Sequence, residues 1–123
     1  MLTVEDVATH FGLRPETIRR KARRGEIQGI RVRRLYRFGW LDVWACEDGP
    51  MPKGARQERY KQQLLSRQKI ASALGVSTRT VDRWIDEGLP TRNAFGAVRL
   101  NPDDATDWLQ LALGATLPAK WWQ

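Results

Sequence analysis

Apolar side chains recur at helical spacing in two short segments of the chain, residues 4–11 and 67–74. A hydroxyl residue precedes each segment, where its oxygen can accept hydrogen bonds from the amides of the first turn. A glycine follows each segment, and glycine takes the left-handed conformation that ends a helix at little cost. The pattern therefore predicts two helices with matching start and stop signals. The apolar positions are Val4, Val7, Ala8, Phe11, Ile70, Ala71 and Leu74, the hydroxyl residues are Thr3 and Ser66, and the glycines are Gly12 and Gly75.

A second helix is expected directly after each glycine turn. Pro15 holds a first-turn position in one segment, where its missing N–H costs nothing, and Ser77 is a suitable N-cap in the other. Gly25 and Gly88 are expected to end these second helices. Two short helices joined by a tight turn form a helix-turn-helix, whose second helix enters the major groove of DNA.

The two motifs belong to an internal repeat, because the chain aligns with itself at an offset of 63 residues without a gap over the key positions. Residues 2–27 lie on residues 65–90 in this alignment, and we interpret the two stretches as copies of one module. The identical or similar pairs are Leu2/Leu65, Thr3/Ser66, Val7/Ile70, Ala8/Ala71, Gly12/Gly75, Leu13/Val76, Thr17/Thr80, Ile18/Val81, Arg20/Arg83 and Gly25/Gly88.

A short β-hairpin is expected after each helix pair, which makes each module a winged helix-turn-helix. The first stretch reads IRVRRLYRF and interleaves apolar residues with arginines. Neither Arg33 nor Arg34 favours a positive φ, so a tight two-residue turn is not favoured and a longer loop is possible. The second stretch, RNAFGAVRL, offers Asn93 and Gly96 for its turn. The expected fold class is mainly α with short β wings, in two tandem winged helix-turn-helix modules.

A short helix that contains tryptophan closes each module, in WLDVWACE and in PDDATDWLQLALG. Between the modules, glycines and prolines at 49–54 indicate a hinge, and the sequence from Ala55 is typical of a helix that leads into the second copy. The expected organisation is a first module at 1–48, a hinge and linker helix at 49–64, a second module at 65–115 and a tail with tryptophans at 116–123.

The charge of the chain indicates which class of partner it binds. The chain has 21 Lys and Arg residues against 14 Asp and Glu, a net charge of +7, and nucleic acid or an anionic membrane surface is the usual partner of so basic a protein. Residues 14–37 hold ten basic side chains and two acidic ones, so this segment alone carries +8. Such concentration on one helix and one hairpin favours contact with a polyanion over a face that is merely solvated.

The residues quoted above resemble a known family. LTVEDVATHFGLRPETIRRKARRGEIQGIRVRRLYRF is similar to the winged helix-turn-helix of excisionases and of the related MerR-type DNA-binding domains, and SRQKIASALGVSTRTVDRWIDEGLP resembles the same family. The resemblance covers about 2–48 and 65–113, and it implies that the second helix lies in the major groove with the wing near the flanking minor groove. The first copy departs from the family pattern at Arg14, where a serine cap is usual, and at Lys21, where the second copy has Trp84. The DNA-contact candidates of the first module are Arg14, Glu16, Thr17, Arg19, Arg20, Arg23 and Arg24 on the helix and Arg31, Arg33, Arg34 and Arg37 on the wing.

The second module is expected to be the weaker DNA binder. Residues 65–123 carry seven basic and six acidic side chains, a net charge of +1. Asp82 either accepts a hydrogen bond from a cytosine amine or pairs with an arginine on the same helix. The DNA-contact candidates here are Ser77, Arg79, Thr80, Asp82 and Arg83.

Other chemistry has little support. One cysteine, Cys46, and one histidine, His10, make neither an internal disulfide nor a zinc set, and no glycine-rich phosphate motif is present. His10 has no Ser or Cys partner at a recognisable spacing, and we expect it at the surface or half-buried. We therefore expect no enzyme, cofactor or metal site. The sequence has no apolar run of about 18 residues and no signal peptide, which predicts a cytoplasmic protein with no membrane partner.

The sequence predicts a protein that binds specific double-stranded DNA, and the resemblance implies an excisionase-like architectural or directionality factor of a phage or mobile element. A small transcriptional repressor and a phage terminase small subunit are alternatives. A different class of function is a protein-interaction adaptor whose second module binds a recombinase or polymerase. Trp121 and Trp122 in the tail either dock on a neighbouring protomer or partner protein or pack on the chain's own second module, and we expect Trp84 in the core.

Overall fold

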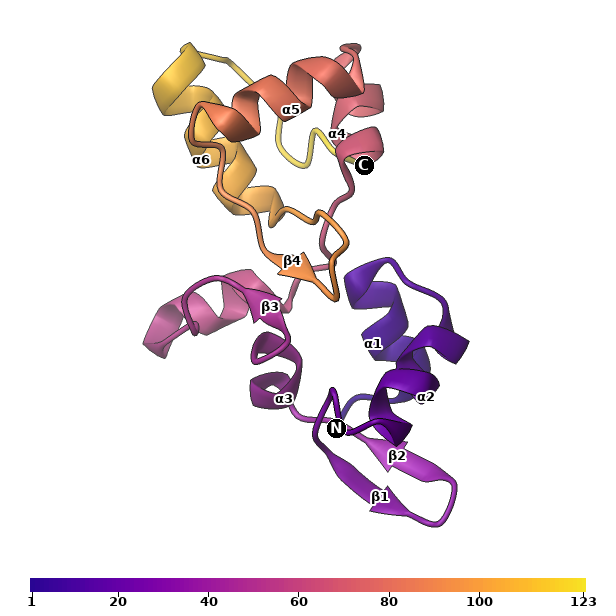
Figure 1. The fold of residues 1–123 in the computed structure, drawn as a ribbon. Helices are drawn as coiled ribbons and strands as arrows, with labels where there is room; N and C mark the ends of the chain where they lie inside the picture. The colour runs from indigo at the N-terminus through magenta and orange to yellow at the C-terminus, as the bar shows by residue number, and fades with distance from the viewer. The chain divides into compact units, whose positions relative to one another are not determined.

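A computed structural model describes residues 1–123 of the chain (Figure 1). Its helix boundaries follow the capping signals of the sequence. The chain divides into two units, Met1–Gln63 and Leu64–Gln123. Both units are mostly helical with short strands, and all helices fall short of the length and apolar character that a membrane span requires. The first unit contains α1 (Val4–Phe11), α2 (Pro15–Arg23), β1 (Ile30–Val32), β2 (Leu35–Arg37), α3 (Trp40–Trp44), β3 (Glu47–Asp48) and the 3-10 helix η1 (Gly54–Lys61), and the second contains α4 (Arg67–Leu74), α5 (Thr78–Asp86), β4 (Asn93–Ala94) and α6 (Pro102–Leu113).

The expected helix starts are confirmed. The Thr3 hydroxyl accepts from the Asp6 amide at 3.1 Å, and the Ser66 hydroxyl accepts from the Lys69 amide at the same distance. The Ser77 hydroxyl caps α5 by accepting from the Thr80 amide. In contrast, α2 starts with Pro15 at its first turn and has no side-chain cap. Three of the four paired helices therefore begin with a hydrogen-bonded hydroxyl.

Glycines end these helices as expected. Gly12 and Gly75 adopt φ values of 67°, in the left-handed region, and turn the chain from the first helix of each pair into the second. Gly25 and Gly88, with φ values of 73° and 120°, follow the last residues of α2 and α5. Because other residues adopt such angles at a cost, these four glycines set where each helix pair turns and stops.

The core of the first unit joins the helix pair to the hairpin. Phe11 of α1, Ile18 of α2 and Val43 of α3 are fully buried. Phe38 directly follows β2, is also buried, and exchanges two backbone hydrogen bonds with Leu2, at 2.8 and 2.9 Å. The residue that leads into α1 is thus paired with the end of the hairpin, which fixes the hairpin beside the two helices.

His10 is buried, so the expectation that it lies at the surface or half-buried is wrong. Its Nε2 lies 2.8 Å from the Glu47 carboxylate, and both side chains are almost completely shielded from solvent. The imidazole also packs edge-on against Trp40, with ring centroids 5.1 Å apart. Because Glu47 lies 37 residues further along the chain, no local spacing reveals this pair.

The second unit buries its own tail. Trp121 is 8% exposed and belongs to the core that also contains Ile70, Val81 and Leu109, while Trp122 packs partly buried against that core. The Trp121 indole N–H donates to the Thr106 hydroxyl at 2.8 Å. Of the two alternatives for Trp121, the structure shows the packing on the chain's own second module.

Two further expectations are met only in part. Trp84 packs against the second core but is half-buried rather than enclosed. The linker helix is a 3-10 helix, in which Tyr60 is the one buried side chain. The Tyr60 carbonyl accepts from the Trp44 indole at 3.0 Å, which holds η1 against α3. With so little apolar surface on η1, nothing stabilises a full amphipathic α-helix there.

Candidate nucleic-acid interface

The orientation of α2 follows from its single fully buried residue, Ile18. Side chains on the opposite side of the helix must face solvent, since successive residues turn by about 100°. The structure leaves five of the predicted contact residues of this helix exposed and Thr17 half-buried. The exposed residues are Arg14, Glu16, Arg20, Arg23 and Arg24.

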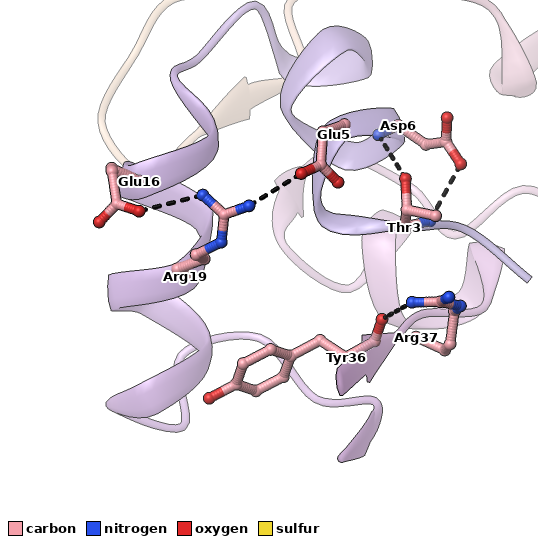
Figure 2. A network of polar contacts seen from close by, with 7 residues as sticks. All are labelled: Thr3, Glu5, Asp6, Glu16, Arg19, Tyr36 and Arg37. Carbon is pink, nitrogen blue, oxygen red and sulfur yellow. Dashed lines mark hydrogen bonds and ion pairs between the residues drawn. The ribbon is translucent and has the colours of Figure 1, made fainter. Parts of the chain in front are cut away.

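Arg19 differs from these arginines because it is held between two carboxylates. It donates to Glu16 at 3.0 Å and to Glu5 of α1 at 2.8 Å, so that its guanidinium reaches from α2 to α1 (Figure 2). Its positive charge is thereby balanced within the unit, and its side chain is 37% exposed. The arrangement suits the joining of two helices better than the binding of a phosphate.

The second unit contains a matching ion pair with the charges exchanged. Asp82 of α5 stands 63 residues after Arg19 and accepts from Arg67 of α4 at 2.7 Å. The sequence predicts either a cytosine contact for Asp82 or a pair with an arginine on its own helix, whereas its partner lies on the other helix. Both helix pairs thus carry one bridging ion pair, with the acid on the first helix in one unit and on the second helix in the other.

The remaining candidates on α5 present a balanced surface. The Ser77 and Thr80 hydroxyls lie 3.0 Å apart and share a hydrogen bond within the cap. Arg79 and Arg83 are exposed, and the Arg83 guanidinium lies 4.0 Å from Glu87. This helix therefore offers a polyanion much less net charge than α2 does.

The first hairpin turns tightly, contrary to the expectation of a longer loop. Strands β1 and β2 are antiparallel, with Val32 opposite Leu35, so only Arg33 and Arg34 form the turn. Arg33 adopts a φ of 56°, which is unfavourable for a residue with a side chain. Gly29 lies just before β1, where a Cβ atom would come within 2.6 Å of the Arg37 carbonyl oxygen. The turn places two arginines at the tip of the hairpin.

The register also decides which side chains share a face, because directly paired residues point to the same side of an antiparallel pair. Arg31 pairs with Tyr36 and lies over its ring, 5.4 Å from the ring centroid. Arg31 Nε also donates to the Arg33 carbonyl. Exposed apolar side chains occupy the other face, where Val32 pairs with Leu35 and Ile30 pairs with Arg37.

Arg37 bends back toward the start of α1. It donates to the Tyr36 carbonyl at 2.7 Å, as Figure 2 shows. Nearby, the Thr3 amide donates to the Asp6 carboxylate at 3.0 Å; this hydrogen bond most strongly lowers the pKa of Asp6, and the charge of Arg37 adds a smaller effect. Arg37 is thus partly engaged with its own unit, whereas Arg33 and Arg34 extend from the tip.

The second hairpin is shorter and turns at other residues than expected. Ala94 and Ala97 exchange backbone hydrogen bonds, so Phe95 and Gly96 form the turn, with φ values of 50° and 82°. Asn93 is not a turn residue, and its side chain accepts from the Arg99 amide. The glycine expected in this turn is present, but the asparagine stabilises the return of the chain instead.

Comparison with known families agrees with the two helix pairs. Residues 1–44 match the family described as Helix-turn-helix domain, and residues 58–87 match the family described as Homeodomain-like domain. No curated protein and no solved structure gave a significant match. The two matches identify helix-turn-helix domains, which supports DNA binding as the function of the chain, and neither describes a catalytic family.

Proposed function

We propose that this helix-turn-helix protein binds duplex DNA in a sequence-specific way, mainly through its first unit. In this proposal α2 lies in the major groove, and the β1–β2 hairpin follows the flanking minor groove. One observation carries the proposal: six exposed arginines on α2 and the hairpin tip form no ion pair with the chain's own acids. They are Arg14, Arg20, Arg23, Arg24, Arg33 and Arg34.

Different arginines take different parts in this proposal. Arg20 lies almost opposite Ile18 on α2, where a side chain can reach the edges of the bases. Arg33 and Arg34 contact phosphates or the narrow minor groove, since they stand at the tip of the hairpin. Arg19 instead holds α2 against α1, because both Glu5 and Glu16 already bind it.

For the second unit we propose a supporting role on the same DNA. Its helix pair repeats the hydroxyl cap of the first helix and the glycine turns of the first unit, which supports the interpretation of the two units as copies of one module. The acids on α5 reduce its attraction to phosphate, as the ion pairs of Asp82 and Glu87 indicate. The adaptor function remains the second candidate for this unit, because the balanced charges of its outer surface attract DNA less than those of α2 and leave that surface open to a protein partner.

The biological role that we propose is that of an excisionase-like architectural or directionality factor of a phage or mobile element. The resemblance of the first module to excisionases supports it. A small repressor or a terminase small subunit would use the same surface. Bending of the bound duplex, measured by circular permutation of the site, distinguishes an architectural factor from a simple repressor.

The DNA contact is tested with the full chain and duplexes from an in vitro selection. Affinity for a random duplex should fall steeply with salt, because each neutralised phosphate contributes about 0.9 to the log-log slope, or roughly 5 for six arginines. Arg20→Ala should reduce the preference for the selected site over a scrambled one by about 1–3 kcal/mol, whereas Arg34→Gln should weaken both alike. Lys120→Gln, which removes an exposed charge of the second unit, is the matched control.

A flat salt dependence contradicts DNA binding through this surface. Equal losses on both sites for Arg20→Ala contradict its role in reading bases. A loss for Lys120→Gln as large as that for Arg34→Gln contradicts the assignment of the contact to the first unit.

A further inference from the structure

The wing, which is the β1–β2 hairpin, has an apolar outer face although its sequence is rich in arginine. Ile30, Val32 and Leu35 are 52%, 59% and 51% exposed, and the strand register places all three on one side of the hairpin. An exposed apolar side chain on its own is ordinary, but three adjacent ones on a two-stranded hairpin form a continuous patch.

The opposite side of the hairpin already packs on the unit. Tyr36 and Phe38 lie there with their rings parallel and 6.2 Å apart, beside Ala22 and Ile27 of the α2 region. Phe38 is fully buried and Tyr36 half-buried. A slip of the strand register by one residue would exchange the two faces of the hairpin and expose Phe38. Because Phe38 is buried, the outward position of Ile30, Val32 and Leu35 does not result from such a slip.

We propose that this outer face, Ile30, Val32 and Leu35, buries itself against the deoxyribose edges of the DNA minor groove. The inference rests on the proposed function and adds to it a contact that is apolar rather than electrostatic. Sugar C–H groups line the walls of that groove, and minor-groove proteins commonly place apolar side chains against the DNA.

Charge and size both support DNA as the occupant. Arg33 and Arg34 stand at the tip beside the apolar face, so the hairpin approaches a polyanion with its charges first. A second copy packed on this face would bring two strongly basic segments together, since residues 14–37 carry a net charge of +8, and like charges repel. Three side chains also fall far short of the roughly 20–30 residues that each partner contributes to a stable protein interface.

An apolar contact differs from a phosphate contact in its response to salt. Burial of apolar surface releases no counterions, so its share of the affinity should stay constant as salt rises. The triple variant Ile30→Thr, Val32→Thr, Leu35→Thr keeps all charges and retains residues suited to strands. It should bind the selected duplex about tenfold more weakly at every salt concentration, with an unchanged slope. Arg34→Gln should lower the slope by about 0.9.

Footprinting locates the contact on the DNA. Hydroxyl radicals attack deoxyribose from the minor groove, and dimethyl sulfate methylates guanine N7 in the major groove. In the triple variant the hydroxyl-radical protection beside the site should be lost, whereas the protection of guanines contacted by α2 should persist. The matched control is Leu111→Gln, which removes a side chain that is 88% exposed on α6 and should change neither measurement.

Two checks keep the test decisive. The backbone NMR spectrum of the triple variant must retain the strand shifts of β1 and β2; if the hairpin is lost, Val32→Thr alone replaces it, with an expected loss of about two- to threefold at constant slope. Unchanged affinity and footprint would overturn the proposal, while salt-dependent binding of the wild-type chain would leave the proposed function standing. A reduced sedimentation coefficient for the variant alone would assign the face to a second copy and overturn the proposal as well.

Discussion

The buried contact between His10 and Glu47 should stabilise the first unit more than any exposed ion pair. The change that tests it is His10→Ala, which removes the imidazole from a carboxylate whose side chain is 0% exposed. Removal of one partner from a buried pair typically costs about 3–5 kcal/mol. The substitution also removes the packing of the ring against Phe11 and Trp40. We expect His10→Ala to lower the free energy of unfolding by about 4 kcal/mol. This is a large part of the roughly 5–15 kcal/mol by which an ordinary domain is stable.

Two companion variants separate the hydrogen bond from the packing. Glu47→Gln keeps an oxygen that can accept from Nε2, so it should cost only about 1 kcal/mol. Leucine at both positions replaces the polar pair by apolar side chains and should cost less than the two single leucine variants added together. Amide hydrogen exchange, followed residue by residue, is the suitable assay because α1 reports on the first unit while α4 serves as the internal control.

Two results would contradict a stabilising contact between His10 and Glu47. If His10→Ala changes the protection of α1 by no more than about 0.5 kcal/mol, the contact behaves like a surface substitution and our account of it is wrong. If the double leucine variant costs the full sum of its singles, the two side chains are not energetically coupled, whatever the 2.8 Å between them suggests.

Three further predictions concern other parts of the chain. Trp121→Ala should lower the free energy of unfolding by about 3–5 kcal/mol, measured by thermal or urea unfolding, and Trp122→Ala, which affects a half-buried ring, should lower it less. An unchanged unfolding transition for Trp121→Ala would favour the interpretation that the tail binds a partner. Arg33→Gly should stabilise the hairpin by about 1 kcal/mol because glycine accepts the φ of 56° without strain, and a destabilised variant would show that the arginine side chain matters more than the backbone. Burial and the nearby acids raise the pKa of the Cys46 thiol to about 11, so at pH 8 only about one thiol in a thousand is ionised; alkylation should be slow in the native chain and fast in urea, and equal rates would contradict the burial.

Local signals predicted the helix pairs well. Thr3, Ser66 and Ser77 cap helices, and Gly12 and Gly75 turn the chain, because caps and left-handed glycines act on neighbouring residues and are readable from sequence alone. The exposed arginines of α2 were also predicted, since one buried residue fixes the rotation of a short helix.

Contacts between distant residues could not be predicted in this way. His10 and Glu47 are 37 residues apart, and nothing near either one indicates the other. The angle of Arg19 on α2 points outward and predicts a DNA contact, yet Glu5 on the neighbouring helix binds this side chain.

The hairpin turn shows a different limit, because Arg33 disfavours the conformation that the strand register imposes on it. Alternation within a strand reveals two faces without saying which faces outward. The apolar outer face of the wing therefore became visible only once the partners of both strands were known.

The exchanged charges between the two helix pairs bear on how a chain with two similar modules folds at all. If α1 docked on α5, Glu5 would meet Asp82, and if α4 docked on α2, Arg67 would meet Arg19. Wrong pairing would thus replace two attractive ion pairs by two pairs of like charge. For partly exposed groups at low salt, the free energies of the correct and the wrong pairing would differ by about 2 kcal/mol. Repeated domains are prone to exchange equivalent elements while they fold or at high concentration. Here the sign of one charge on each helix identifies its proper neighbour, so that two helix pairs of the same shape remain distinguishable.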